Sequence, residues 1–110
     1  GKIISFITDI EHPPGNPIKS VIDLARNSDL LIHEGHFAPE DIETHLGWGH
    51  SSWVEAVGVA KASHSKRLIM NHHSPDYEDT RIAILEADAK KEFKNSSFSR
   101  SEETIYIPIK

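Results

Sequence analysis

Four short apolar runs, each bounded by polar or turn-forming residues, predict the strands of this chain of 110 residues. Three of them lie in the first two thirds of the chain, and one lies near its C-terminal end. The runs cover residues 3–7, 30–32, 66–71 and 104–109. Pro108 stands at the end of the last run, where the loss of a backbone N–H costs a sheet little.

Helical signals lie between the first three runs. Asn16 and Pro17 suit the N-cap and the first turn of a helix. Ser52 and Glu55 have the spacing of a capping box, so a second helix should run from about residue 53 to about residue 62. The positions expected to pack in these two helices are Ile18, Val21, Ile22, Ala25, Val54, Val57 and Val59.

Three further segments complete the predicted order of elements. Pro39 opens a short helix over residues 39–45, and Asp79 can cap a helix that runs to Phe93. The polar segment 94–103 is expected to be a loop. Strands that alternate with helices predict an α/β fold, with a sheet that is buried at least on its helix-covered face.

The composition is that of an ordinary globular domain, with 37% hydrophobic and 26% charged residues. No apolar run approaches the roughly 20 residues that span a bilayer, so we expect no membrane segment. The chain has 12 Lys and Arg against 17 Asp and Glu, which gives a net charge of −5. Because binding to a phosphate backbone needs clustered cations, this charge argues against a general nucleic-acid-binding module.

The chain contains no cysteine and eight histidines. Disulfides, thiolate catalysis and cysteine-based zinc sites are therefore excluded, and the composition agrees with a cytoplasmic location. Any metal ion would have to be held by His, Asp and Glu side chains.

Polar side chains follow the apolar residues of three predicted strands. Asp9 follows the first, His33 and Glu34 follow the second, and His72 and His73 follow the third. In α/β sheets, ligands gather outside the carboxyl ends of the strands. The pattern predicts a site of carboxylates and imidazoles at one edge of the sheet.

Each of these residues also has a purely structural interpretation. Asp9 alone is more often a turn or capping residue than a metal ligand, and His33 with Glu34 can form a strand-end pair bonded to the backbone. His50 stands on a glycine-flanked loop before a helix, where a functional and a helix-capping imidazole are equally expected. His36 lies close enough to the second strand end to line the same site. We expect packing roles for Trp48 and Trp53, and surface positions for His12, His45 and His64.

The joint pattern is more specific than its parts. Residues 3–85, with the segments TDIE, SDLLIHEGHF, GWGHSSWVEAVGVAKAS and KRLIMNHHSPD, resemble the C-terminal half of metallo-β-lactamase-fold hydrolases. The resemblance is to the branch that contains the tRNA 3′ processing endonuclease Z and bacterial phosphodiesterase-like relatives. It implies an α/β chain that forms the C-terminal half of a four-layered αββα sandwich.

The resemblance implies a role for each polar residue at the strand ends. Asp9 matches the carboxylate that bridges two divalent metal ions, and His72 matches a ligand of the second ion, with zinc as the expected metal and manganese or iron as alternatives. Glu34 and His50 match a catalytic dyad in which the carboxylate orients an imidazole that protonates the leaving oxygen. His33, His36 and His73 would line the site.

The principal metal motif of these hydrolases, His-x-His-x-Asp-His, does not occur in the 110 residues. We therefore expect residues 1–110 to form a single partial domain that is inactive alone. The complete protein would hydrolyse a phosphodiester in RNA, in a cyclic nucleotide or in a small molecule.

The alternative is a non-catalytic half-domain that associates with itself or pairs with a separate N-terminal half. Either partner would cover apolar strand residues at 3–7, 30–32 and 68–70, which a lone half-fold leaves open to water.

Overall fold

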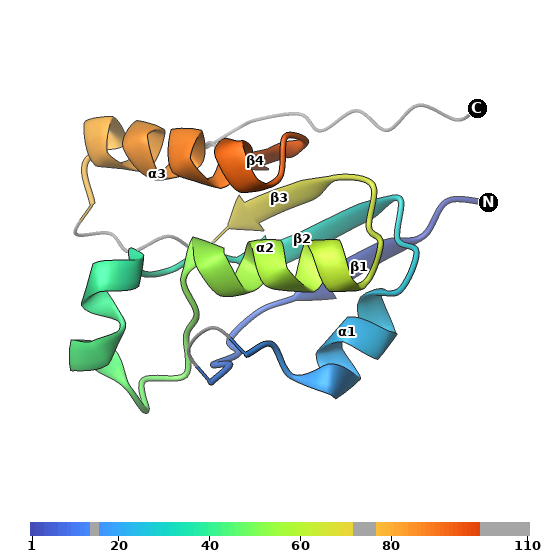
Figure 1. The fold of residues 1–110 in the computed structure, drawn as a ribbon, viewed down its shortest axis with the longest axis horizontal. Coiled ribbons are helices and arrows are strands. Elements are labelled where there is room, and N and C mark those ends of the chain that lie inside the picture. Colours follow the sequence, from blue (N-terminus) through green and yellow to red (C-terminus); the bar gives the residue numbers. More distant parts are fainter. Residues whose placement is uncertain (14–15, 72–76, 100–110) are drawn as a thin grey trace.

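The computed structural model describes residues 1–13, 16–71 and 77–99 (Figure 1). Strands and helices alternate along the chain, with two single-turn 3₁₀ helices between β2 and α2. The elements are β1 (Ile4–Ile7), α1 (Lys19–Ala25), β2 (Leu30–Glu34), η1 (Pro39–Asp41), η2 (Glu43–His45), α2 (Trp53–Ala62), β3 (Leu68–Asn71), α3 (Asp79–Glu92) and β4 (Ser96–Phe98).

The four described strands form one parallel sheet in the order β1-β2-β3-β4. Each strand is joined to the next by a segment that contains a helix, as parallel pairing requires. The carboxyl ends of β1, β2 and β3 therefore lie at the same edge of the sheet. The predicted α/β fold is confirmed.

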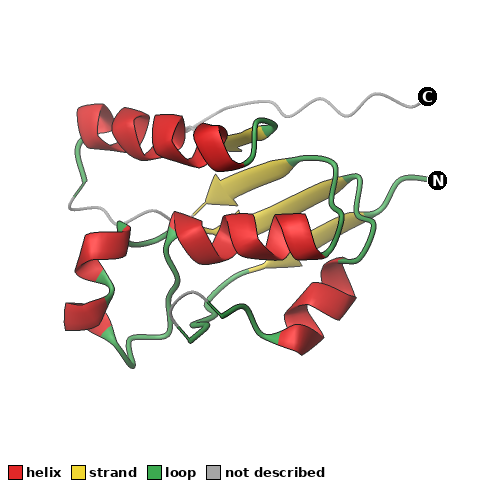
Figure 2. Cartoon of the chain, in the orientation of Figure 1, coloured by secondary structure: helices red, strands yellow, loops and turns green. Residues whose placement is uncertain are grey.

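The helices cover one face of the sheet. In Figures 1 and 2, α2 lies across this face, with α1 and α3 on either side of it. Alternate strand residues point toward the helices and meet their small and branched side chains. This core contains Ile7, Leu31, Leu68, Met70 and Phe98 from the strands, and Ala25, Ala56, Val57, Val59, Ala60, Ile82, Leu85 and Ala89 from the helices.

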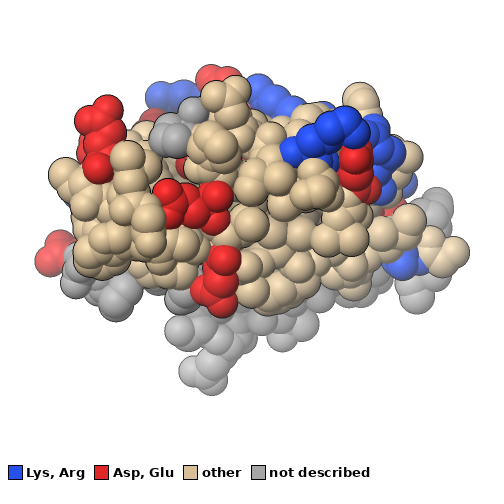
Figure 3. Space-filling view, turned by 90° about the horizontal axis from the view of Figure 1, so that it is seen from below, with Lys and Arg blue, Asp and Glu red and all other residues tan. Residues whose placement is uncertain are grey.

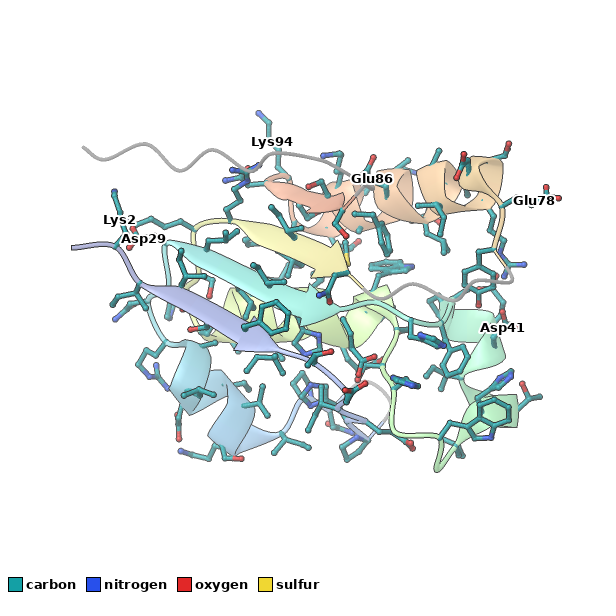
Figure 4. The ribbon with its side chains drawn as sticks, turned by 180° about the vertical axis from the view of Figure 1, so that it is seen from behind. Lys2, Asp29, Asp41, Glu78, Glu86 and Lys94 are labelled. Atoms are coloured by element: carbon teal, nitrogen blue, oxygen red, sulfur yellow. The ribbon has the colours of Figure 1, made fainter. Side chains whose placement is uncertain are left out.

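The opposite face of the edge strand β1 is open. Ile4 is 54% exposed and Phe6 is 58% exposed, although both are large apolar residues. Seen from behind in Figure 4, β1, β2 and β3 lie in front of α2. The apolar residues of all three strands were expected to lie open to water. This expectation is wrong for β2 and β3, because Leu30 and Ile69 are buried. Among the described strands, the apolar surface that lies open to water is concentrated on β1.

The helix α2 has the predicted bounds and the predicted cap. The Ser52 hydroxyl accepts the N–H of Val54 at 3.1 Å, and the Glu55 carboxylate accepts the N–H of Ser52 at 2.9 Å. Val57 and Val59 are buried as expected, and Val54 is partly buried. The start of the helix is thereby fixed, together with the loop that leads into it.

The helix α1 begins later than predicted, and the predicted Asn16 cap is wrong. Ile18 is the N-cap residue, and its backbone N–H donates to Nδ1 of His12 at 2.8 Å. That bond holds Ile18 in an extended conformation, so the helix starts at Lys19. Pro17 instead packs against α2, where a Cβ on Gly58 would come within 2.8 Å of the proline ring. Of the predicted packing positions, Ala25 is buried, and Ile18, Val21 and Ile22 are partly buried.

The predicted loop over residues 94–103 is wrong in its first half. Ser96–Phe98 forms β4, in which Phe98 is 1% exposed and donates its N–H to the Glu86 carboxylate at 2.6 Å. The ring of Phe98 also packs against Gly35, where a Cβ would lie only 3.0 Å from it. A single buried aromatic residue thus anchors this short strand. The predicted strand over residues 104–109 lies outside the described residues.

Smaller corrections concern the remaining helices and the two tryptophans. The predicted helix over 39–45 is two separate 3₁₀ turns, and α3 starts at Asp79, so this residue is not its cap. Trp48 is 64% exposed, against the expected packing role, and Trp53 packs on the core. No helix in the described part of the chain is long and apolar enough to cross a membrane.

Candidate functional site

Glu34 and His50 meet at the carboxyl edge of the sheet. Glu34 ends β2 and is fully buried, and its Oε2 lies 2.7 Å from Nδ1 of His50. Its Oε1 accepts the backbone N–H of Ile10 at 2.6 Å. The carboxylate therefore fixes the orientation of the imidazole, whose Nδ1–H donates to it and whose Nε2 is the second site for proton exchange.

Glu11 holds the loop that carries His50. Its carboxylate accepts the backbone N–H of Gly47 at 2.9 and 3.0 Å and that of Gly49 at 2.9 Å. Both glycines have positive φ, 86° and 85°, a conformation that other residues resist. The two backbone N–H groups lower the pKa of Glu11. Nothing in the sequence singles out Glu11, and only the two glycines indicate an unusual loop there.

Ser51 ties the same loop to the segment after β1. Its hydroxyl donates to the carbonyl of Ile10 at 2.6 Å, and its backbone carbonyl accepts the N–H of Phe37 at 3.2 Å. Ser51 is fully buried. The segments that follow β1 and β2 are therefore joined to the residues just before α2.

Asp9 lies at the end of β1, next to this dyad. Its Oδ1 is 4.0 Å from Nδ1 of His50, and its side chain is 70% exposed. The backbone of Asp9 has a positive φ of 52°, which aspartate tolerates better than most residues. The structure thus brings together Asp9, Glu34 and His50, three of the four principal residues predicted from the sequence.

The fourth principal residue, His72, and the neighbouring His73 lie outside the described residues. β3 ends at Asn71, which pairs in register with Glu34. The chain therefore reaches the edge of the site at the residue that precedes His72.

His36 stacks on His50. The two imidazole rings are 4.2 Å apart between centroids and 18° from parallel. Glu34, His36 and His50 offer ligand atoms that all lie within 4.8 Å of one another, so these three residues could hold a metal ion. The cluster supports two uses, a hydrogen-bonded dyad with a stacked neighbour, or a metal site.

His33 lies on the other face of β2 from the Glu34 side chain, because neighbouring strand residues alternate. It is fully buried, and its Nε2 lies 3.0 Å from Nε2 of His12. The predicted surface position of His12 is wrong, because this residue is 3% exposed. His64 is exposed as predicted, and His45 is partly buried against Phe37.

The His12–His33 pair is neutral. Nδ1 of His12 accepts the N–H of Ile18, so Nε2 of His12 carries its hydrogen and donates to His33. Nδ1 of His33 in turn lies 2.8 Å from the carbonyl of Glu34 and donates to it. Burial lowers the pKa of His33 to about 4 and also lowers the pKa of His12. The pair holds the backbone of Glu34 through His33 and the start of α1 through His12.

Tyr77 anchors the segment that follows His36. Its hydroxyl accepts the N–H of Ala38 at 2.8 Å and donates to the carboxylate of Asp41. Arg81 lies 4.6 Å from the centre of the Tyr77 ring. Burial raises the pKa of Tyr77 to about 12, so the hydroxyl keeps its proton.

Comparison with known proteins identifies the architecture around this site. The chain is 33% identical to a protein named Ribonuclease Z from Lactobacillus helveticus over 110 residues, which is the whole of this chain and 34% of that protein. It is 39% identical over 80 residues to Ribonuclease Z from Archaeoglobus fulgidus, which is 73% of this chain and 26% of that protein. YhfI, a metallo-β-lactamase-fold protein from Bacillus subtilis, superposes with a TM-score of 0.63 and is 28% identical over 77% of this chain and 33% of its own. The chain has the metallo-β-lactamase fold, in the part that corresponds to its C-terminal half.

A second solved protein has the same architecture. The short form of human tRNase Z superposes with a TM-score of 0.63 over 91% of this chain and 32% of its own, at 23% identity, which supports the fold alone. The predicted C-terminal half of a metallo-β-lactamase sandwich is thereby confirmed as the fold. The chain spans about a third of the length of the curated relatives that it matches. No protein-family model matches it.

Proposed function

We propose that this chain supplies the general-acid half of a metal-dependent phosphodiester hydrolase. The observation that carries the proposal is the 2.7 Å contact between the buried Glu34 carboxylate and the half-buried His50 imidazole. With Nδ1–H held by the carboxylate, a proton on Nε2 can be delivered to the leaving oxygen of a phosphodiester. Glu34 acts through His50 and is a positioning residue.

The donor groups present fit a divalent metal ion. The Asp9 carboxylate is well exposed at the strand end beside the dyad, and carboxylate and imidazole donors suit zinc, manganese and iron. We assign Asp9 as a ligand, together with His72, which lies outside the described residues. Glu34 fits less well as a ligand, because its two oxygens already accept hydrogen bonds from Ile10 and His50. Two bound metal ions would supply an activated water and neutralise charge on the phosphate.

The proposed substrate is RNA. Support comes from the relatives, which are named Ribonuclease Z and match the whole chain. A cyclic nucleotide or a small phosphodiester is the alternative, and the net charge of −5 favours a short substrate over a long one. The absence of cysteine fits a cytoplasmic enzyme.

We further propose that residues 1–110 are a partial domain whose open sheet face is covered by the remaining half of the fold. The exposed apolar side chains of Ile4 and Phe6 support this. A second sheet at about 10 Å would bury them, as in other sandwiches of two sheets. The same observation favours the second candidate function, a non-catalytic half-domain that pairs with itself.

Calorimetric titration with zinc distinguishes a Glu34–His50 dyad from a metal site formed by Glu34, His36 and His50. If His50 and Glu34 are a dyad, the 110-residue chain should bind zinc weakly, because too few ligands are present to complete a coordination sphere. It should also leave bis-p-nitrophenyl phosphate and RNA uncleaved, whereas the complete protein should cleave RNA and lose this activity with a chelator. His64→Ala is the control, since His64 is exposed and lies outside the cluster.

Two results would overturn parts of the proposal. Submicromolar zinc binding that His36→Ala abolishes would make Glu34, His36 and His50 a metal site in place of a dyad. Cleavage of RNA by the complete protein at the same rate with and without chelator would refute the metal-dependent reaction.

A further inference from the structure

Trp48 is a large aromatic residue at the surface of the site. It is 64% exposed, and it stands two residues before His50. An exposed tryptophan contributes little to a core, and a loop residue near a site is more often functional than structural.

The loop that presents Trp48 is rigidly held. The residues on both sides of it donate their backbone N–H groups to Glu11, in bonds of 2.9 to 3.0 Å. The indole ring meets His45 edge-on at 4.6 Å between centroids, with the ring planes 80° apart. It meets Phe37 in the same way at 6.3 Å and 73°. These contacts fix the indole while most of its surface stays in water.

The same ring of Phe37 connects Trp48 to the proposed proton donor. His50 contacts Phe37 edge-on at 6.2 Å and 74°, almost the same geometry as Trp48. The indole and the imidazole therefore both contact one phenyl ring, and only Gly49 separates the two residues along the loop.

The charge around the site favours an aromatic mode of recognition. Asp9, Glu11 and Glu34 place three carboxyl groups within the described site. Figure 3 shows acidic side chains toward the end of the molecule that carries the 3₁₀ helices, and basic ones toward the opposite end and along the upper edge of the view. Recognition of a phosphodiester near His50 thus depends on contacts other than clustered cations.

We propose that Trp48 is a stacking platform for a nucleobase of the substrate. This base belongs to the nucleotide whose phosphate lies at His50. This inference rests on the proposed function, because it assigns a second contact to the same substrate. Aromatic side chains stack on every base through its flat face, which gives affinity with little sequence preference. The substrate class is therefore a nucleotide phosphodiester, in which the base contributes to binding.

The test is calorimetric titration of the 110-residue chain with adenosine 5′-monophosphate and with ribose 5-phosphate, which has the same phosphate and no base. The nucleotide should bind more tightly than the sugar phosphate. Trp48→Leu should weaken binding of the nucleotide by about 5- to 150-fold, the value of one stacked base, and leave binding of the sugar phosphate unchanged. Trp48→Phe should retain most of the affinity.

Leu46→Ala is the matched control, because Leu46 is 54% exposed on the same loop but carries no ring. It should leave both affinities unchanged. Equal affinities for the two ligands, including no measurable binding of either, overturn the inference, and so does a Trp48→Leu variant that binds the nucleotide normally. Binding is measured without metal or turnover, so failure of the proposed hydrolysis would leave this result intact.

Discussion

His12 and His33 share a 3.0 Å hydrogen bond in the interior, and neither ring carries a charge. The first prediction follows from this pair. Its histidines take up protons near pH 6.5 in the unfolded chain, whereas His33 resists protonation in the fold until about pH 4. As pH falls from 6.5 to 4, the unfolded state binds more protons than the folded state, so the free energy of unfolding decreases.

The expected loss from His33 is about 3–4 kcal/mol, at about 1.4 kcal/mol for each pH unit between 6.5 and 4. Urea unfolding at a series of pH values measures it, and stability should be level above pH 7 as far as this pair is concerned. His64→Ala, which removes an exposed histidine, should leave the profile unchanged. A free energy of unfolding that stays level between pH 6.5 and pH 4.5 would contradict the neutral pair.

The second prediction concerns the dyad in the complete protein. His50→Ala and Glu34→Ala should each lower kcat by about 10²–10⁴, the usual contribution of a general acid, with metal content near normal. Removing both should cost little more than removing one, because the two side chains serve a single step. On p-nitrophenyl esters, whose leaving group needs no proton, the His50→Ala defect should largely disappear. Loss of metal in His50→Ala would refute the assignment.

The third prediction concerns Asp9, which should behave differently from the dyad. Asp9→Ala should remove metal and activity together, because a carboxylate ligand is lost. The defect should be as large on the activated ester as on an alkyl phosphodiester. Metal analysis beside the two kinetic assays checks this. The control is Glu92→Ala, which removes an exposed carboxylate paired with Lys61. An Asp9→Ala protein with full metal content would exclude a ligand role.

The fourth prediction concerns Glu11 as the support of the His50 loop. Glu11→Ala removes the acceptor of three backbone hydrogen bonds, so the loop over 47–49 should loosen. Stability should fall by about 1 kcal/mol, and kcat of the complete protein should fall about tenfold through misplacement of His50. Glu11→Gln, which keeps an acceptor oxygen, should recover part of the rate. If Glu11→Ala lowers stability and leaves kcat unchanged, the positioning role is wrong.

Local signals explain the parts of the fold that the sequence predicts correctly. The cap of α2 depends on Ser52 and Glu55, three residues apart, so its spacing is visible without a structure. β1, β2 and β3 are marked by apolar runs. Asp9 and Glu34 come together because parallel strands place their carboxyl ends at one edge, and His50 reaches them from the loop before α2. Their chemical roles are still predictions.

Long-range contacts explain what the sequence does not reveal. Glu11 is 36 residues from Gly47, and His12 is 21 residues from His33. A polar residue with so distant a partner resembles any surface residue, and for that reason His12 was expected on the surface. β4 is the short segment Ser96–Phe98, whose pairing with β3 depends on one buried phenyl ring. No periodic pattern can arise in three residues.

The fifth prediction is that the 110-residue chain self-associates through the open face of β1. Ile4 and Phe6 are each more than half exposed on the same side of this edge strand. Apolar residues grouped in this way favour association in water, because contact with another molecule buries them. Edge strands also present unpaired backbone groups. Sedimentation velocity over a concentration series should show a rising average mass.

Phe6→Lys should shift this association to higher concentration, because a charge at the centre of the contact would have to be buried. The matched control is Leu24→Lys, since Leu24 is 67% exposed but lies on α1, on the helix-covered side. It should leave the association unchanged. A wild-type chain that stays monomeric at high concentration, or a Phe6→Lys chain that associates as strongly as the wild type, would show that this face needs no partner.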